Sequence, residues 1–305
     1  MADTKTIKTK LKSVDNIRKI TKAMEMVARS KMKKAIDRAL GIRPYAFFAL
    51  EFLVNFSYHT AAVSPFFQKM DGERTLILEI SANKGLCGGY NGNIFRELRK
   101  YVTSNDARDL TDYIVVGKYA VHHAKLLGGK LLHSFTDFSE DITRAEIEQV
   151  SNLVKKEWET GAYKKVIIAF TNFKSTLSQK PIIRQLLPLS LEIVENQIAE
   201  GGGEENWVDL PALHLQRNWS RFVIEPSEDA ILDFIIPQLV TVQIYHAILD
   251  ALASEQAARM IAMKNATENA NKLGDKLLLS FNHIRQEGIT RELSEIAAGA
   301  EALSN

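Results

Sequence analysis

The feature that most constrains this chain is a proline-free stretch at its C-terminal end, residues 238–305. Apolar residues recur in it at steps of three and four, which is the period of an amphipathic α-helix. At about 1.5 Å per residue, a helix over these 68 residues would be roughly 100 Å long. A helix of that length needs a partner along its apolar side, and the rest of the chain must supply one.

A second long helix is predicted at the N-terminal end. Asp3 or Thr4 can cap a helix that runs at least to Arg43, and Gly41 and Pro44 predict a kink or a break before it resumes toward residue 60. Its apolar positions again follow a spacing of three and four: Ile7, Leu11, Val14, Ile17, Ile20, Met24, Val27, Ala28, Met32, Ala35, Ile36 and Ala39. Two such helices can pair antiparallel if the chain between them folds compactly and returns. We therefore expect residues 1–60 and 227–305 to form an antiparallel coiled coil without a strict heptad.

The middle of the chain has the alternation of an α/β domain. Four short runs rich in branched residues predict strands: Thr75–Ile80, Asp112–Gly117, Lys165–Phe173 and Pro181–Leu187. Helical stretches lie between them at Asn93–Val102, Lys118–Leu127 and Thr143–Thr160. The order predicts a largely parallel sheet over residues 73–190. Residues 191–226, which include Gly201–Glu205, are predicted to be a polar loop and return segment, followed by a helix capped by Ser227 and bent at Pro237.

Composition and charge limit the possible functions. The single cysteine, Cys87, rules out an internal disulfide, no apolar run is expected to reach membrane-spanning length, and the N-terminus lacks the apolar core of a secretory signal. Residues 1–43 carry 13 Lys and Arg against 4 Asp and Glu, a balance of +9 in a chain whose net charge is +2. Such a segment attracts nucleic acid, anionic lipid or an acidic protein surface. It contains no aromatic residues for base stacking, so an acidic protein accounts for it as well as nucleic acid does.

One stretch could serve a nucleotide-dependent enzyme. Residues Ser81–Asn91 are glycine-rich and lie between a predicted strand and a helix, where a phosphate-binding loop would be found. Their spacing fits neither GxGxxG nor the P-loop pattern, so the glycines are better explained by tight turns. The adjacent His122 and His123 point about 100° apart on a helix and cannot readily share a metal. We find no catalytic constellation and expect neither cofactor nor metal.

Four segments carry a resemblance to a known family. They are Ile17–Ala35 (IRKITKAMEMVARSKMKKA), Ser81–Phe95 (SANKGLCGGYNGNIF), Ala253–Ala270 (ASEQAARMIAMKNATENA) and Ile289–Leu303 (ITRELSEIAAGAEAL). Together they resemble the gamma subunit of F-type ATP synthase, the central rotor shaft. The resemblance implies an antiparallel coiled coil with a Rossmann-like α/β domain beside its foot. It also implies a non-catalytic subunit that couples ion flow through the c-ring to conformational change at the beta-subunit catalytic sites.

The resemblance further implies partners and contact residues. The partners are the alpha, beta and epsilon subunits and the c-ring, at the cytoplasmic face of the plasma membrane, where the chain would be peripheral. Residues matching the family region that faces acidic lever loops of beta are Lys22, Met24, Arg29, Lys31 and Lys33. Those matching the segment that meets a catch loop of beta are Arg285, Gln286, Thr290 and Glu292. The last helix is expected to lose heptad regularity around Asn265–Asn271 and to outrun the first helix from Ala270 onward.

Overall fold

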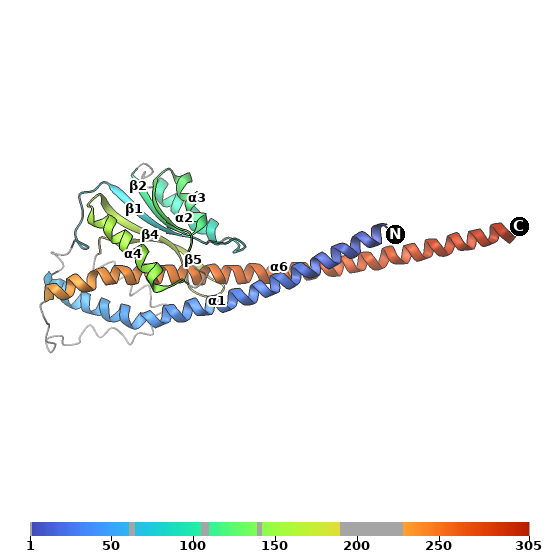
Figure 1. Cartoon of the computed structure of the whole chain (residues 1–305), viewed down its shortest axis with the longest axis horizontal. Helices are drawn as coiled ribbons and strands as arrows, with labels where there is room; N and C mark the ends of the chain where they lie inside the picture. The colour runs from blue at the N-terminus through green and yellow to red at the C-terminus, as the bar shows by residue number, and fades with distance from the viewer. Residues whose placement is uncertain (1, 61–64, 105–109, 139–141, 190–227, 305) are drawn as a thin grey trace. The chain divides into compact units, whose positions relative to one another are not determined.

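The computed structural model describes residues 2–60, 65–104, 110–138, 142–189 and 228–304 (Figure 1). The chain divides into two compact units. Met1–Arg29 and Arg259–Asn305 form one, which we call the helix-pair unit; Ser30–Ala258 form the other, which we call the α/β unit. We describe each by itself. The return segment predicted at residues 191–226 and the predicted Ser227 cap lie outside the described residues.

A five-stranded mixed sheet forms the centre of the α/β unit. Its strands are β1 (Arg74–Ile80), β2 (Thr111–Val116), β3 (Lys130–Phe135), β4 (Tyr163–Phe173) and β5 (Gln179–Leu187). The order in the sheet is β3-β2-β1-β4-β5; the first four strands are parallel, and β5 is antiparallel to β4. The chain therefore winds outward from β1 to β3 and then returns to β4, the reversal beside the first strand that doubly wound α/β folds have.

Helices cover both faces of this sheet. The helices between the strands are α2 (Tyr90–Ser104), α3 (Lys118–Leu127) and α4 (Arg144–Glu159), and the C-terminal helix is α6 (Glu228–Ser304). On β1, Leu76 and Leu78 enter a cluster with α4 and α6, whereas Ile77 enters a separate cluster with α2 and α3 (Figure 1). Strands buried on both faces are apolar at every position, which explains why these runs were recognisable.

Each strand and helix predicted between residues 75 and 187 overlaps an observed element, but β3 was missed. It lies at the edge of the sheet, pairs only with β2 among the described strands, and has three partly buried and three exposed residues. Its sequence, KLLHSF, has no run of branched residues because an edge strand of this kind needs none. Residue burial, rather than backbone pairing, is what the sequence pattern reports.

Two buried polar groups tie elements of the α/β unit together. At the start of the strands, Arg74 Nε donates to Asp112 Oδ2 at 2.9 Å, and Tyr163 Oη donates to the same oxygen at 2.9 Å. Between sheet and helices, His123 Nδ1 of α3 lies 2.7 Å from Glu79 Oε1 of β1, and these side chains are 3% and 0% exposed. Burial raises the pKa of the Glu79 carboxyl, and the hydrogen bond and charge of His123 oppose that rise.

The Glu79–His123 pair is incompletely hydrogen-bonded. The His123 ring stacks on Phe95 of α2 with 4.2 Å between ring centroids. Glu79 Oε2, His123 Nε2 and the nearby Tyr113 Oη have no hydrogen-bond partner among the described residues. A buried charge whose partners are incomplete costs free energy that an uncharged group of the same shape does not.

In the α/β unit α6 is a core helix. Its side chains that pack under the sheet include Ile236, Leu239, Val240, Ile244, Ala247, Ile248 and Ala251. Its hydrogen bonds to neighbouring elements include two to backbone carbonyls: Tyr90 Oη donates to the Ala251 carbonyl at 3.0 Å, and Ser254 Oγ donates to the Thr171 carbonyl at 3.0 Å. Contrary to the sequence-based expectation, one 18-residue window within Asp233–Ala298 is apolar enough for a membrane span, but 56% of it is buried, as in a core helix.

Both long helices are continuous through their prolines. Helix α1 (Ala2–Thr60) continues through Gly41 and Pro44, so a break there is contradicted and the alternative of a kink stays a prediction; the helix begins before the predicted caps Asp3 and Thr4. Helix α6 is continuous through Pro237, where the predicted bend also stays a prediction, and the Pro237 carbonyl accepts a hydrogen bond from Thr241 Oγ1 at 3.0 Å. A proline removes one backbone donor, and the flanking turns of a long helix can compensate for that loss.

In the helix-pair unit, residues 2–29 of α1 and 259–304 of α6 lie side by side and run in opposite directions (Figure 1). Thr21 Oγ1 lies 2.8 Å from Thr267 Oγ1. Val14 Cγ1 lies 3.8 Å from the position that a Cβ on Gly274 would take. These two contacts are seven residues apart on each helix, so they belong to one register.

Burial along this pair follows a seven-residue repeat. On α6 one set of buried and half-buried positions alternates at steps of four and three: Met263, Thr267, Ala270, Gly274, Leu277, Phe281, Ile284 and Gly288, with half-buried Ala266 and Asn282 beside it. On α1 the corresponding set is Ile7, Leu11, Val14, Thr21, Glu25 and Ala28, with half-buried Asp15 and Met24 beside it. Within Asn265–Asn271 the positions of this set are the polar Thr267 and the small Ala270, and the expected loss of heptad regularity there stays a prediction. Conversely Ile17, Ile20 and Val27, which the sequence placed in the inner stripe, are 52%, 58% and 53% exposed.

The same register shows where α6 extends past the start of α1. Val14 faces Gly274, so α1 follows α6 well past Ala270, and the expectation that α6 is alone from Ala270 is wrong. Counting along both helices at an equal rise per residue brings Ala2 level with about residue 286 of α6. Helix α6 extends beyond the start of α1 (Figure 1).

The buried pair gives a prediction for Glu79→Gln. Because the pKa of Glu79 is raised in the folded protein, the folded state holds this proton more tightly than the unfolded state, and the parent loses stability as pH rises above about 4.5. Glutamine keeps an acceptor for His123 but cannot ionise. Urea unfolding between pH 4 and 8 should show that the free energy of unfolding of the variant rises relative to that of the parent as pH rises, by about 1 kcal/mol or more.

The exposed Glu73→Gln substitution is the matched control and should not alter the pH profile. A constant difference between Glu79→Gln and the parent across this range would contradict the assignment of a buried, ionising carboxylate.

Candidate functional site

The sequence-predicted contact residues of α1 lie on its surface. Within the helix-pair unit, Lys22 and Arg29 are exposed and Met24 is half-buried. In the part of α1 that belongs to the α/β unit, Lys31 is half-buried and Lys33 is exposed. The side chains of Lys22 and Arg29 are 56% and 67% exposed, so both cations can reach a partner.

A buried carboxylate that the sequence analysis did not identify organises two of these cations. Glu25 is only 6% exposed at its side chain; its Oε2 lies 3.0 Å from Lys22 Nζ and its Oε1 lies 3.5 Å from Arg29 Nη2. The spacing of three and four residues places both bases beside it on one helix. One negative charge thus partly offsets two positive ones, which fixes the positions of both cations. The signal in the sequence is a lone acid flanked by bases at these spacings.

Asp15 repeats the arrangement in an exposed setting. Its carboxylate pairs with Arg18 at 2.6 Å and with Lys19 at 2.7 Å. The hydrogen bond from Lys19 is the main cause that lowers the pKa of Asp15, and the charges of Lys19 and Arg18 act in the same direction. Asp15 and Glu25 therefore differ chiefly in burial.

The predicted contact residues of α6 lie near the level where α1 begins. Arg285, Gln286 and Thr290 are exposed, and Glu292 lies in the helix. The Arg285 guanidinium carbon is 6.0 Å from the centroid of the Phe281 ring, an inner residue of the pair. The structure thus brings these residues together on one helical segment.

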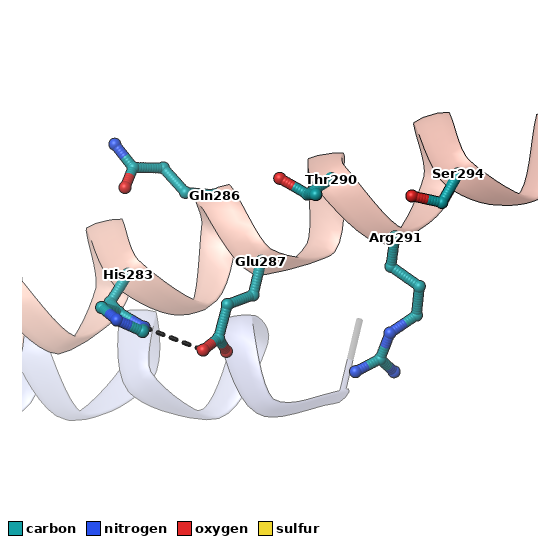
Figure 2. A pocket seen from close by; sticks show the side chains of 6 residues that line it. All are labelled: His283, Gln286, Glu287, Thr290, Arg291 and Ser294. Carbon is teal, nitrogen blue, oxygen red and sulfur yellow. Dashed lines mark ion pairs between the residues drawn. The ribbon is translucent and has the colours of Figure 1, made fainter.

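A shallow open depression groups two of them with residues that the sequence analysis missed. Figure 2 shows Gln286 and Thr290 on one side of α6 and Glu287 and Arg291 on the other. His283 Nδ1 pairs with Glu287 Oε1 at 3.0 Å. The lining residues are His283, Gln286, Glu287, Thr290, Arg291 and Ser294. Polar residues recurring every four positions were the signal available in the sequence.

Large apolar side chains also lie uncovered on this segment. Ile289, Leu293 and Ile296 are 50%, 63% and 68% exposed, and their spacing of four and three places them on one stripe. They lie beyond the level at which α1 starts. A stripe of this kind on a protein surface marks a site where another protein binds.

The first residues of the glycine-rich loop contact the N-terminus of α3. The N–H of Lys118 donates to Asn83 Oδ1 at 3.0 Å, and the N–H of Ala120 donates to Ser81 Oγ at 2.8 Å. These bonds satisfy two of the backbone donors that the first turn of a helix leaves without a partner within the helix. Gly117 has φ +98°, and a Cβ there would lie 2.2 Å from the Ser81 carbonyl oxygen. The loop therefore packs closely on α3 and occupies its N-terminus.

Comparisons with known proteins all point to the same family. The family model described as "ATP synthase" matches residues 3–303. A protein of Haemophilus influenzae named "ATP synthase gamma chain" is 36% identical over 99% of this chain and 100% of its own length. Among solved structures, the central stalk and c-ring of Tetrahymena thermophila mitochondrial ATP synthase matches with a TM-score of 0.58 and 25% identity over 81% of this chain and 99% of that one. A chain of the Euglena gracilis mitochondrial enzyme has a TM-score of 0.62 and 20% identity, covering 99% of this chain and 95% of that one.

The burial of Glu25 gives a prediction for charge reversal. Glu25→Lys would place an ammonium in a buried position beside two cations and should destabilise the protein by about 3 kcal/mol or more. Asp15→Lys, at an exposed site with the same pairing pattern, is the matched control and should shift unfolding far less. Urea unfolding followed by circular dichroism measures both. Equal shifts for the two variants would show that Glu25 is not a buried, structurally required carboxylate.

Proposed function

The chain belongs to the ATP synthase gamma chain family, and from that premise we propose how it works as the central rotor shaft. It couples ion flow through the c-ring to conformational change at the catalytic sites of the beta subunits, and it is not itself catalytic. The observation that carries this proposal is the uncovered end of α6. There, within the part of the chain that the structure describes, α1 no longer runs beside the helix, which presents apolar and polar contact residues together.

The shaft is an antiparallel coiled coil in this proposal. The seven-residue repeat of buried positions on both helices is the spacing that such packing needs. Residues 1–60 and 227–305 make up the shaft, 73–190 the Rossmann-like α/β domain, and 191–226 the return segment. The alanines and glycines at inner positions let two helix backbones approach closely, which favours a slender, stiff rod.

The collar around the shaft end is formed by the alpha and beta subunits. The stripe Ile289, Leu293 and Ile296 provides apolar contact, and burying each such side chain is worth about 1.5–3 kcal/mol. Arg285, Gln286, Thr290 and Glu292 meet the catch loop of beta beside this stripe. The exposed His283–Glu287 pair is close enough in the helix to take part in the same contact.

Lower on α1, Lys22, Met24, Arg29, Lys31 and Lys33 face the acidic lever loops of beta. Lys22 and Arg29 already share Glu25, so each offers a positioned but partly neutralised charge. Exposed ion pairs are worth about 0–1 kcal/mol each. Contacts of that strength suit a surface that must form and break them on every turn.

Torque follows from differential contact. An asymmetric shaft touches the three beta subunits differently in each orientation, and it favours a different conformation in each by the difference in contact free energy. The foot rests on epsilon and the c-ring, and the chain is peripheral at the cytoplasmic face of the membrane that holds the ring. The solved relatives carry titles that name the central stalk, F1 and the c-ring, which supports this set of partners.

The apolar stripe gives the test of this function. The double variant Leu293→Asp/Ile296→Asp should leave the isolated chain folded, because neither side chain has a covering neighbour among the described residues. It should weaken co-assembly with alpha and beta by at least about tenfold, from the loss of two buried apolar contacts. Titration of labelled chain against the alpha–beta complex measures this.

Leu177→Asp is the matched control, since Leu177 is 85% exposed in the turn between β4 and β5. It should assemble like the parent. Equal assembly of the double variant and this control would contradict a collar closing on the end of α6.

A further inference from the structure

The inner side of the helix-pair unit includes a polar contact between the helices that the proposed function does not use. Thr21 Oγ1 and Thr267 Oγ1 lie 2.8 Å apart, and Thr21 is only 9% exposed. Each hydroxyl is also within reach of a carbonyl of its own helix: Arg18 O at 3.1 Å from Thr21, and Met263 O at 2.9 Å from Thr267.

The proton count limits these contacts. Each hydroxyl has one hydrogen to donate and can also accept. One threonine must therefore donate across to the other helix, while the second accepts that bond and donates back to its own carbonyl. The bond between the two hydroxyls forms only when Thr21 and Thr267 face each other; in another register each hydroxyl can still donate to the carbonyl of its own helix.

The repeat of inner positions does not by itself exclude a slide of one heptad. Ala28, Ala270 and Gly274 are small, and the apolar residues around them recur at the same spacing. A slide of one heptad preserves the repeat of buried positions and moves the helices by about 10 Å. It would face each threonine with a different residue, and the bond between the helices would be lost.

We propose that Thr21 and Thr267 fix the register of α1 and α6 in the helix-pair unit, as positioning residues. A single buried polar pair can specify register in paired helices while adding little to stability. The consequence for torque rests on the proposed function, because a shaft that slides would move its contact residues past their partners. The register itself does not depend on any partner, and its test uses the full chain alone.

The test measures disulfide formation in a glutathione redox buffer, on a Cys87→Ala background. The pair Val14→Cys/Gly274→Cys reports the observed register, since these positions face each other. The pair Val14→Cys/Phe281→Cys reports a slide of one heptad. Replacing both threonines by valine should lower the ratio of the first pair's effective concentration to the second's about fivefold, the factor that one buried hydrogen bond is worth.

Three controls separate register from stability. Thr21→Ser/Thr267→Ser keeps both hydroxyls and should behave like the parent. Thr9→Val removes an exposed hydroxyl that donates to Lys5 O of its own helix, and should also leave both cysteine pairs unchanged. Urea unfolding of the valine variant should match the parent closely, because two apolar groups of similar shape replace a bonded pair.

If the valine variant kept parental values for both cysteine pairs, the register assignment would be overturned. It would equally be overturned if the serine variant changed them as much as the valine variant does. Should the double valine variant unfold, Thr267→Val alone decides the matter, since Thr21 can still donate to Arg18 O and remain satisfied. Loss of assembly with alpha and beta, without a change in either cysteine pair, would concern the proposed function and not the register.

Discussion

A helix as long as α6 is stable in water only where its apolar side is covered. In the α/β unit the sheet and α4 cover it, and it is buried nearly all round from Ile236 to Ala257. In the helix-pair unit α1 covers one side. Past the start of α1 nothing described covers Ile289, Leu293 or Ile296. Along its length, α6 is thus first a core helix, then one helix of a pair, and finally a helix with an uncovered apolar stripe.

The inner positions of the pair combine small and polar residues with larger apolar ones. Val14 packs against Gly274, and Ala28 and Ala270 are buried. Glu25 is tolerated there because Lys22 and Arg29 supply its counter-charges from the same helix. Burial of Glu25 positions those cations, so the inner side of α1 determines what its outer side presents.

The sequence predicted the fold correctly where the buried residues are also the apolar ones. Strands buried on both faces are apolar throughout, so β1, β2 and β4 were recognisable, whereas the edge strand β3 was not. The two long helices were predicted from their period, but the inner positions were misassigned. Ile17 and Ile20 resemble core residues and are exposed, whereas Thr21 and Glu25 resemble surface residues and are buried.

The candidate site shows the same limit. The basic residues of α1 and the polar residues of α6 could be identified only through the family resemblance, because exposed polar residues on a helix have no distinguishing period. The roles of Glu25 and of the His283–Glu287 pair depend on which face of each helix is buried. The sequence alone does not show that, because the position of the partner helix is not known from it. The continuity of α1 through Pro44 was not predicted for a similar reason. A proline by itself indicates a break, and the sequence around it does not show what maintains the helix.

The central claim is that this chain turns inside a collar of alpha and beta subunits. The most direct measurement attaches a probe to Leu126→Cys, an exposed position on α3, in a Cys87→Ala background, with the beta subunits fixed to a surface. On adding ATP, the account predicts rotation of the probe in one direction with three stopping positions per turn, one for each beta site. A probe that stays still or moves at random while the complex hydrolyses ATP would contradict it.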